Sequence, residues 1–302
     1  MSKLEGRVAI VTGAGRGIGA AIAETFAREG ASVVVNDLGA AMDGDGQDDK
    51  AAAQVVADRI NAAGGKAAAN TESVTDFKAA ERMIQQAVDE FGKLDILVNV
   101  AGIIRDGLIF KMEEEQWDQV IDVHLKGTFN TTRHASVYWR ANRGGQYRLI
   151  NFVSGSGLFG SPVQPNYAAA KMGIVGLTFS CANALYNYGV TSNCIAPIAF
   201  TRMTASLQGK GTTLDYSPEN PKLSPDNVTP PVVYLAMEES DWLNGRVIEA
   251  GNAKIGLFEN FRMGRQVGTE AVWDLDASIE EMKAAFQPAL GNPNPFAPRP
   301  KD

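Results

Sequence analysis

This sequence of 302 residues contains few cysteines and carries no net positive charge. The two cysteines, Cys181 and Cys194, lie in apolar stretches, and no pattern of further Cys or His ligands accompanies them. We interpret them as buried packing residues in preference to a disulfide or a nucleophile, and we expect no metal site. The formal net charge is −7 and the isoelectric point is near 5.1. This acidity argues against nucleic-acid binding and against attachment to an anionic membrane surface.

Long hydrophobic runs and targeting signals are also lacking. No apolar run approaches the ~20 residues that a bilayer-spanning helix needs. The stretch Met1 to Gly6 has no apolar core of the kind that signal peptides carry. The last residues, Arg299 to Asp302, do not form the tripeptide that directs proteins to peroxisomes. We therefore expect a cytoplasmic protein with no membrane partner.

Short β-branched runs alternate with longer helical patterns through the first two thirds of the chain, in the manner of a parallel sheet covered on both faces. The predicted strands are Val8 to Thr12, Ser32 to Asp37, Lys66 to Asn70, Leu94 to Val98, Arg148 to Val153, Thr191 to Ile195 and Val247 to Ala250. The predicted helices are Gly17 to Arg28, Lys50 to Ala62, Phe77 to Glu90, Glu114 to Trp139, Tyr167 to Asn187 and Asn227 to Met237. The sequence therefore predicts an α/β fold, a Rossmann-type doubly wound parallel sheet of seven strands with helices on both faces.

The repeating pattern ends at Asn252. We predict a dinucleotide-binding catalytic domain over residues 1–252 and a C-terminal extension over residues 253–302. The extension combines an apolar patch, Ile255 to Phe261, with a helical stretch, Ile279 to Phe286, and a Pro-rich end. Its apolar patch requires burial, which favours either an oligomer contact or a lid over the substrate pocket.

A glycine-rich turn, Thr12-Gly13-Ala14-Gly15-Arg16-Gly17-Ile18-Gly19, follows the first predicted strand, and a helix begins near Ala20. Glycines permit a tight turn and a close approach of the backbone to a pyrophosphate, and the helix N-terminus attracts an anion. A purely structural turn is the alternative. The position between strand and helix favours a dinucleotide site. Its predicted cofactor contacts are Gly13, Arg16, Gly17, Ile18 and Gly19.

The second predicted strand ends at an acidic residue, Asp37, at the distance from the glycine turn that a dinucleotide motif requires. A carboxylate there accepts hydrogen bonds from the adenosine ribose and repels a 2′-phosphate, which favours NAD over NADP. Arg16 argues the other way, because a basic residue in this turn can pair with that phosphate. We weigh Asp37 more heavily. The acidic run Asp43 to Asp49 lacks EF-hand spacing and is interpreted as a solvated loop.

A tyrosine and a lysine stand four residues apart in Tyr167-Ala168-Ala169-Ala170-Lys171, which places both on one face of a predicted helix. A nearby ammonium lowers the pKa of a tyrosine from about 10 toward the working pH. Tyr167 is therefore predicted to be a general base for an alcohol and a general acid for a ketone. Ser154 follows the fifth predicted strand, where its hydroxyl can hold the substrate oxygen, and Ser156 is the competing candidate.

These motifs resemble those of the short-chain dehydrogenase/reductase family. The glycine turn, Asn99-Val100-Ala101-Gly102, Ser154, Tyr167 and Lys171 occur in the family's order, over roughly residues 4–252. The resemblance implies hydride transfer with a nicotinamide cofactor. It implies that Lys171 also binds the nicotinamide ribose and that Val74 and Ala101 lie near the adenosine, with Asn99 and Gly102 of the same motif on the cofactor side.

Three positions depart from the family pattern. Val100 replaces an Asn that supports the sheet. His124 stands where the family usually has an Asn that helps to hold a relay water near the lysine, and we include it among the candidate catalytic residues. A structural role for His124 inside its helix is the alternative. After Pro197, Ile198 replaces the usual Gly, and we assign the nicotinamide contact of this stretch to Thr201.

Further stretches are similar to the (3R)-hydroxyacyl-CoA dehydrogenase unit of the peroxisomal multifunctional β-oxidation enzyme and its bacterial relatives. They are Val35 to Gly39, Ile104 to Asp106, His124 to Gly127, Gln164 to Tyr167 and Thr201 to Thr204. The similarity implies oxidation of a (3R)-hydroxyacyl-CoA, with a fatty or steroid-like acyl group, to the 3-ketoacyl-CoA. A hydroxysteroid or another secondary alcohol is the alternative substrate. The segment Ala199 to Pro225, rich in Thr, Gly, Ser and Pro, is predicted to be a mobile flap that selects between them.

Two further expectations concern turnover and assembly. A protein that senses NAD without turnover is the non-enzymatic alternative, and the intact set Ser154, Tyr167 and Lys171 argues against it. Family members usually associate through the helices that correspond to Glu114 to Trp139 and Tyr167 to Asn187. The resemblance therefore implies a homodimer or a homotetramer. Apolar residues around much of the second helix support this expectation.

Overall fold

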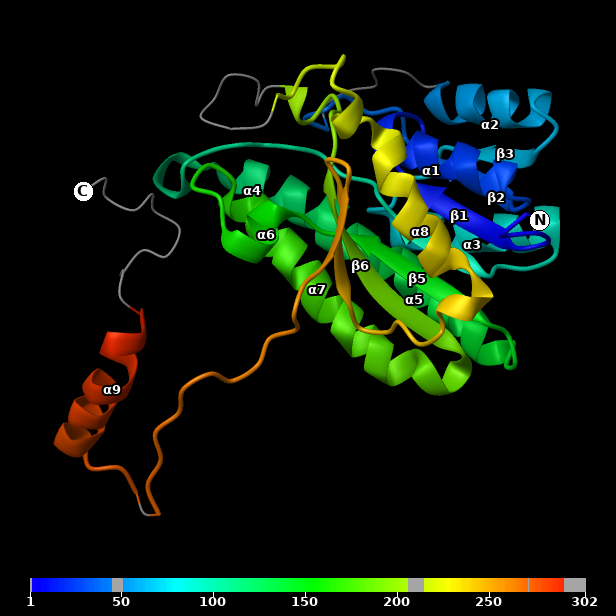
Figure 1. Ribbon diagram of the computed structural model, residues 1–302. Helices are drawn as coiled ribbons and strands as arrows, with labels where there is room; N and C mark the ends of the chain where they lie inside the picture. Colours follow the sequence, from blue (N-terminus) through cyan, green and yellow to red (C-terminus); the bar gives the residue numbers. More distant parts are fainter. Residues whose placement is uncertain (1, 45–50, 206–214, 271, 291–302) are drawn as a thin grey trace. The chain divides into compact units, whose positions relative to one another are not determined.

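An eight-stranded sheet forms the centre of the part of the chain that ends at Phe258 (Figure 1). The computed structural model describes residues 2–44, 51–205, 215–270 and 272–290. These residues divide into two compact units, one up to Phe258 and one from Glu259 onward. The first unit contains the sheet and all of the predicted site residues. In the described part of the second, one helix, α9 (Leu275–Leu290), covers the helical stretch predicted there.

The strand order is β3-β2-β1-β4-β5-β6-β7-β8. Neighbouring strands from β3 to β7 run parallel, and only β8 is antiparallel to its neighbour. The strands are β1 (Val8–Thr12), β2 (Ser32–Asn36), β3 (Lys66–Asn70), β4 (Ile96–Asn99), β5 (Tyr147–Phe152), β6 (Val190–Ile198), β7 (Val247–Gly251) and β8 (Lys254–Leu257). The central strands are buried because helices cover both faces of the sheet. The predicted doubly wound parallel sheet is confirmed.

The eighth strand corrects the prediction of seven. Asn252 and Ala253 have φ angles of 49° and 55°, the left-handed conformation that a two-residue hairpin turn requires. The chain therefore folds back, and β8 pairs with β7. Asn-Ala is a weaker hairpin signal than Asn-Gly or Asp-Gly, so the sequence pattern does not reveal this turn. As a result the first unit extends to Phe258, beyond the boundary predicted at residue 252.

Among the described residues, three helices cover each face of the sheet. On one face lie α1 (Gly17–Arg28), α2 (Ala52–Ala62) and α8 (Thr229–Ala236) (Figure 1). These helices share an apolar core with alternate residues of β1 and β2. On the other face lie α3 (Phe77–Phe91), α5 (Gly127–Ala141) and α7 (Pro165–Leu185). The shorter segments are α4 (Glu114–Ile121), α6 (Gly155–Phe159), η1 (Ile109–Lys111), η3 (Tyr186–Tyr188), η5 (Pro221–Leu223), η6 (Pro225–Val228) and η7 (Glu238–Ser240).

The long helix predicted over Glu114 to Trp139 contains an irregular turn. It consists of α4, the π-helical segment η2 (Asp122–Lys126) and α5. Such π-helical turns are rare and are often found at functional sites. This one contains His124, one of the predicted site residues, and it directs that side chain into the protein interior.

One segment corrects the expectation that no stretch is apolar enough to span a membrane. Among the described residues, Pro165–Tyr188 has the required length and a mean hydropathy of 1.3. This segment is α7 with η3, and it contacts β6 and α4. Asn166, Lys171 and Thr178 are buried along it. These contacts describe a helix packed on a sheet, and length and composition by themselves are weak signs of a membrane span.

Candidate active site

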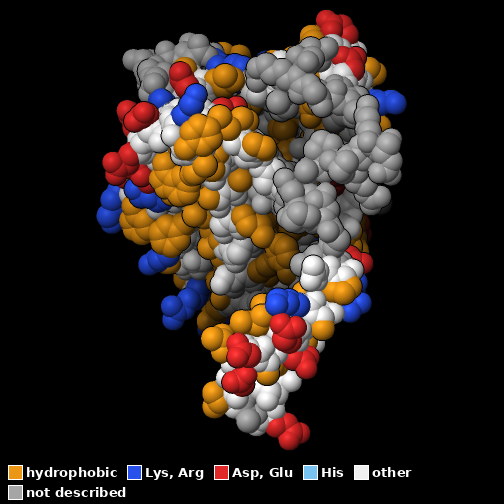
Figure 2. All heavy atoms as spheres, turned by 90° about the vertical axis from the view of Figure 1, so that its left-hand side faces the viewer, with side chains coloured by type: hydrophobic (Ala, Val, Ile, Leu, Met, Phe, Trp, Pro, Cys, Tyr) orange, Lys and Arg blue, Asp and Glu red, His pale blue; other side chains and the backbone are white. Residues whose placement is uncertain are grey.

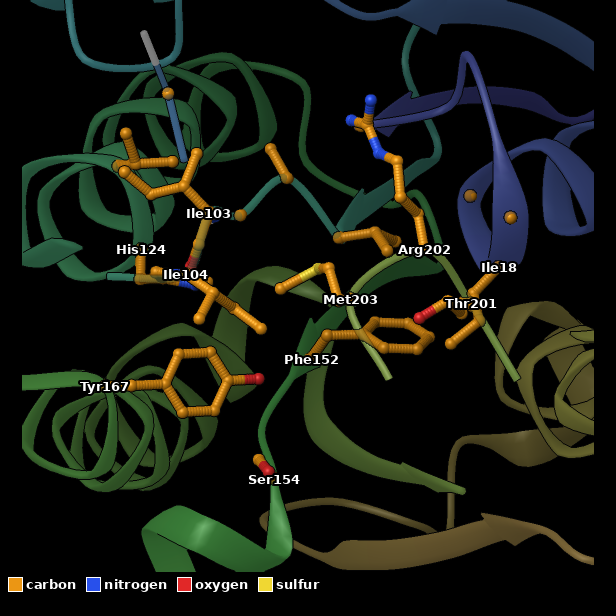
Figure 3. Close-up of a pocket in the computed structure, with 18 of the residues that line it drawn as sticks. Ile18, Ile103, Ile104, His124, Phe152, Ser154, Tyr167, Thr201, Arg202 and Met203 are labelled. Carbon is orange, nitrogen blue, oxygen red and sulfur yellow. The ribbon is translucent and has the colours of Figure 1, made fainter. Parts of the chain in front are cut away.

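A cavity of about 830 Å³ opens at the carboxyl edge of the sheet (Figure 3). It lies where β1 has β2 on one side and β4 on the other, and ligands of open α/β sheets bind at this kind of switch point. The turns that follow the six parallel strands β1 to β6 contribute to its lining. The cavity thereby brings the glycine turn and Asp37 together with Ser154, Tyr167 and Lys171, which are far apart in the sequence.

Two glycines of the turn, Gly13 and Gly19, are packed too tightly to carry a side chain. A Cβ atom at Gly13, where φ is +63°, would lie 2.7 Å from the Cα atom of Ala101. A Cβ atom at Gly19 would lie 2.2 Å from the carbonyl oxygen of Gly13. The turn therefore presents bare backbone and the N-terminus of α1 to the cavity, which suits a pyrophosphate. All five predicted contacts in this turn line the cavity.

The carboxylate of Asp37 is held by two backbone N–H groups. Gly15 N donates to Oδ2 at 2.9 Å, and Gly39 N donates to Oδ1 at 2.7 Å. A side chain at Gly15 would collide with Asp37, because its Cβ atom would lie 2.8 Å from the carboxylate. Each carboxylate oxygen retains acceptor capacity for a further donor. The acidic residues Asp45, Asp48 and Asp49, predicted to form a solvated loop, lie outside the described residues.

The loop after β4 contributes the consecutive residues Val100 to Ile104 to the lining of the cavity. Thr12 Oγ1 accepts hydrogen bonds from Val100 N at 3.1 Å and from Ala101 N at 3.2 Å. These bonds hold Ala101 and Gly102 at the cavity. The sequence reasoning missed Thr12, although a polar residue at the end of an apolar strand is a usable signal.

Asn99 differs from the other predicted cofactor contacts because it does not line this cavity. Its amide donates to Asn151 Oδ1 at 2.9 Å, and its oxygen accepts from Thr131 Oγ1 at 2.7 Å. The structure therefore places Asn99 beneath the site, where it connects β4 to β5. Val74 does line the cavity, where Asn130 of α5 donates to its carbonyl oxygen at 2.9 Å.

Thr201 lies at the cavity, and its contact with the nicotinamide stays a prediction. The backbone N–H of Thr201 donates to Thr204 Oγ1 at 2.8 Å. This bond stabilises the turn at the start of the predicted flap. Within the flap, residues 206–214 lie outside the described part of the chain, and residues 221–223 form η5.

Tyr167 lies in the first turn of α7, and its hydroxyl points into the cavity toward Ser154 (Figure 3). Asn166, which is fully buried, accepts a hydrogen bond from Tyr167 N at 2.8 Å. Its amide donates to Arg105 O and Gln116 O, each at 2.9 Å. Asn166 therefore fixes the start of α7, and its place directly before Tyr167 is the sequence signal for this role.

Lys171 lies one turn further along the same helix. Its Nζ donates to Phe152 O at 2.8 Å and lies 5.5 Å from the centre of the Tyr167 ring. Lys171 is 4% exposed, so its charged form has lost most of its hydration. This burial lowers the pKa of Lys171 to about 7.

The predicted lowering of the pKa of Tyr167 is wrong for this geometry. Burial raises the pKa of Tyr167 to about 12, and the negative charge of Asp106 adds to the effect, while a hydrogen bond with Ser154 opposes it. The Lys171 ammonium is directed to the Phe152 carbonyl and is itself only partly charged near pH 7. The protein side chains therefore keep Tyr167 protonated at neutral pH.

The structure separates the roles of the two serines. Ser154 is the N-cap of α6, and its Oγ accepts a hydrogen bond from Ser156 N at 3.2 Å. Ser156 Oγ donates to Gln164 Oε1 at 2.9 Å, so its proton is engaged away from Tyr167. Ser154 is therefore the serine placed to bind a substrate oxygen together with Tyr167.

His124 lies beside Tyr167 without pointing its ring nitrogens at the phenol oxygen. The two rings meet edge to face, with centroids 5.0 Å apart. Nε2 of His124 lies 2.8 Å from Ile103 O and 3.1 Å from Ile103 N. Burial, and then the charge of Lys171, hold the pKa of His124 well below its usual range, so the ring is neutral. The geometry therefore gives His124 a contact with Ile103, in the loop that follows β4.

Metal ligands and cysteine thiols are two other groups that could carry chemistry. Within the residues that the structure describes, no group of three or more His, Cys, Asp or Glu side chains could hold a metal ion. Both cysteines are free, and the thiol of the buried Cys194 donates to Thr178 Oγ1 at 3.0 Å. This contact agrees with the interpretation of Cys194 as a packing residue.

Comparisons with known proteins agree with this geometry. The family profile described as short chain dehydrogenase matches residues 7–211. Over 299 residues the chain is 41% identical to the hydroxyacyl-CoA dehydrogenase ChsB1 of Mycobacterium tuberculosis, covering 94% of this chain and 91% of that protein. Over 253 residues it is 42% identical to the peroxisomal hydratase-dehydrogenase-epimerase of Neurospora crassa, covering 84% of this chain. That alignment covers 27% of the fungal protein, so the chain spans about a quarter of its length.

A solved structure is also similar. The crystal structure of a short chain dehydrogenase from Mycobacterium avium superposes with a TM-score of 0.80 at 44% sequence identity. The superposition covers 93% of this chain and 96% of that one. The similarity thus includes most of the chain, in sequence and in fold.

Proposed function

The chain belongs to the short-chain dehydrogenase family and is an oxidoreductase that acts on CH–OH groups, and we propose that it uses NAD to interconvert (3R)-hydroxyacyl-CoA and 3-ketoacyl-CoA. The observation that carries the proposal is the meeting of Ser154, Tyr167 and Lys171 with the glycine turn in one cavity. The identity with a protein named as a hydroxyacyl-CoA dehydrogenase supports the substrate class.

The residues of the cavity fit a dinucleotide. The bare backbone at the N-terminus of α1 would bind the pyrophosphate, Asp37 the adenosine ribose, and Lys171 the nicotinamide ribose. When bound, NAD would supply the hydride acceptor for oxidation of the carbinol carbon to a ketone, with release of one proton as NADH forms.

Asp37 supports NAD over NADP for a geometric reason. Because Gly15 N and Gly39 N hold its two oxygens, the carboxylate cannot turn away from a 2′-phosphate without losing both bonds. Arg16 also lines the cavity and would favour NADP. Asp37 repels a 2′-phosphate and would lose hydrogen bonds in turning away from it. Together these two effects outweigh the attraction between that phosphate and the solvent-accessible side chain of Arg16.

The proton is moved by Tyr167 with Ser154 as its partner. Both hydroxyls lie where a substrate oxygen would bind (Figure 3). In the reduction direction, Tyr167 gives its proton to the ketone oxygen, and its pKa of about 12 keeps that proton available. Oxidation needs the phenolate, so we expect it to become faster as the pH rises.

We also propose that the protein is a homodimer or homotetramer. Figure 2 shows groups of exposed hydrophobic side chains on the face that it displays. Phe129 and Val137 of α5 are 45% and 49% exposed, and a contact of this helix with another subunit would bury both side chains. The cytoplasmic location stays a prediction, and it differs from the peroxisomal location in the names of several relatives.

A substrate screen tests the function. (3R)-3-hydroxybutyryl-CoA, a longer 3-hydroxyacyl-CoA, a hydroxysteroid and 2-butanol are each mixed with NAD or NADP, and the absorbance of the reduced cofactor is followed. We expect the largest kcat/KM with a hydroxyacyl-CoA and NAD. A preference for the steroid or the simple alcohol would overturn the substrate class. Tight NAD binding without any absorbance change would favour a sensor.

A further inference from the structure

A chain of hydrogen bonds joins three polar side chains in the substrate half of the cavity. Ser156 Oγ donates to Gln164 Oε1 at 2.9 Å, and Gln164 Nε2 donates to Asp106 Oδ1 at 2.9 Å. All three residues line the cavity together with Ser154 and Tyr167. The proton transfer described above uses none of these three side chains.

The two partners determine which way the Gln164 amide faces. An ionised carboxylate can only accept, so the NH₂ group of Gln164 must face Asp106, and the amide oxygen then accepts from Ser156. One N–H of the amide is used in this arrangement. The second N–H is a donor with a fixed direction, and its orientation requires no rearrangement when a ligand arrives.

The surrounding backbone is fixed as well. Gly107 N donates to Val163 O at 2.8 Å, which joins the loop after β4 to the loop before α7. Gln164 is the N-cap residue of α7, the helix whose first turn carries Tyr167. On the other side, Ser156 is bonded through its N–H to Ser154 Oγ at 3.2 Å. The amide of Gln164 is thus held at a set place relative to both hydroxyls that bind the reacting oxygen.

Resting on the proposed function, we propose that Gln164 is a specificity-determining residue that donates its second N–H to the thioester carbonyl of a 3-hydroxyacyl substrate. That carbonyl carbon is separated from the carbinol carbon by a single CH₂ group, and its oxygen can only accept. Asp106 is the positioning residue that orients the amide. A hydroxysteroid or a simple secondary alcohol has no acceptor at this place, so Gln164 favours the thioester over both.

The test compares two CoA compounds that differ only at this carbonyl: (3R)-3-hydroxybutyryl-CoA and the S-[(3R)-3-hydroxybutyl] thioether of CoA, in which CH₂ replaces C=O. The readout is the ratio of kcat/KM for thioester to thioether. We expect Gln164→Leu to lower this ratio about tenfold, the effect of one lost hydrogen bond to a bound substrate. Gln85→Leu is the matched control, because Gln85 makes the same kind of bond to Asp89 at 2.7 Å on the exposed face of α3. This control should leave the ratio unchanged.

A double-mutant cycle tests Asp106 as a positioning residue. We expect Asp106→Ala to lower the thioester-to-thioether ratio by about fivefold when Gln164 is present, and to leave the ratio unchanged in the Gln164→Leu background. Asp106→Asn should restore most of the ratio, because its amide oxygen can still accept from Gln164. Loss of the negative charge also lowers the pKa of Tyr167, but this shift acts on both compounds and cancels in the ratio.

Two outcomes separate this inference from the proposed function. If wild-type protein oxidises the thioester and Gln164→Leu keeps the wild-type ratio, the role of Gln164 is overturned while the proposed function stands. If wild-type protein oxidises neither CoA compound but does oxidise other secondary alcohols, both proposals are overturned. Equal effects of Asp106→Ala in the two backgrounds would refute its action through Gln164.

Discussion

A Cβ atom at position 102 would lie 2.2 Å from Cε1 of His124, so a glycine is required wherever this histidine occupies its observed place. His124 in turn contacts Ile103 O at 2.8 Å and meets the ring of Tyr167 edge to face. Gly102 and His124 thus fit together beneath the proton-transfer residue. The β4 loop and Tyr167 are held in relation to each other through this pair.

We predict that Gly102→Ala lowers kcat/KM at least tenfold, because the new methyl group must displace His124 and with it Tyr167. His124→Ala removes the obstruction but also the contact with Ile103. The double variant should therefore be no less active than His124→Ala alone. Steady-state kinetics on the three variants measures this, and losses that simply multiply would show that the two residues act independently.

Tyr167→Phe should reduce kcat to about 1% or less, because a positioned general acid–base typically contributes 10²–10⁴-fold. The affinity for NAD, measured by calorimetry, should stay within about threefold, since only the hydroxyl is lost. Lys171→Ala should damage both turnover and NAD affinity. Retention of a tenth of kcat by Tyr167→Phe would contradict the assignment. His124 would then be the next candidate, because it lines the cavity and its ring meets that of Tyr167.

Asp37→Ala should relax the preference for NAD over NADP. Because Asp37 also binds Gly15 N and Gly39 N, we expect affinity for both cofactors to fall while activity persists at high cofactor concentration. Comparing kcat/KM for NAD and NADP measures the change, and Asp43→Ala in the same loop is the control. Wild-type protein that uses NADP as well as NAD would show that Arg16 outweighs the carboxylate.

The stability of the free protein should increase with pH above neutrality because of Lys171. Burial lowers its pKa from 10.5 to about 7, so between these values the unfolded chain binds a proton that the folded protein does not. Folding is therefore favoured as the pH rises, by at most about 1.4 kcal/mol per pH unit. Urea unfolding followed by circular dichroism from pH 7 to 10 measures this slope. In Lys171→Met the slope should become much smaller, and an identical slope would refute the assignment.

Removal of residues 259–302 should leave the first unit folded, because β8 and the rest of the sheet end before this point. We expect the subunit number measured by light scattering to fall, since the exposed apolar residues of the extension require a partner surface. These include Phe261, Met263, Val272 and Leu275. An unchanged mass together with altered substrate affinity would instead favour a lid. Truncation after Asn252 is a poorer test, because it also deletes β8.

The sequence by itself determined the features that depend on local geometry. A glycine turn between a buried strand and a helix forms the same cradle in any chain of this pattern, and four-residue spacing on a helix places Tyr167 and Lys171 on one face. The order of the motifs then identified the doubly wound sheet, because right-handed crossovers leave few other arrangements. The strand ends of such a sheet meet at one edge, so the residues of the site could be named before their distances were known.

Tertiary structure alone decided the features that depend on distant contacts and on burial. Asp106 and Gln164 are 58 residues apart, and no local pattern indicates that they form a hydrogen bond. Asn99 belongs to the expected motif, yet its bonds to Asn151 and Thr131 place it beneath the site. The direction of the pKa shift of Tyr167 was also beyond the sequence, because desolvation depends on every atom that excludes water from the hydroxyl. Spacing fixes which side chains are neighbours along an element, whereas only the packed structure fixes how much water and charge surround them.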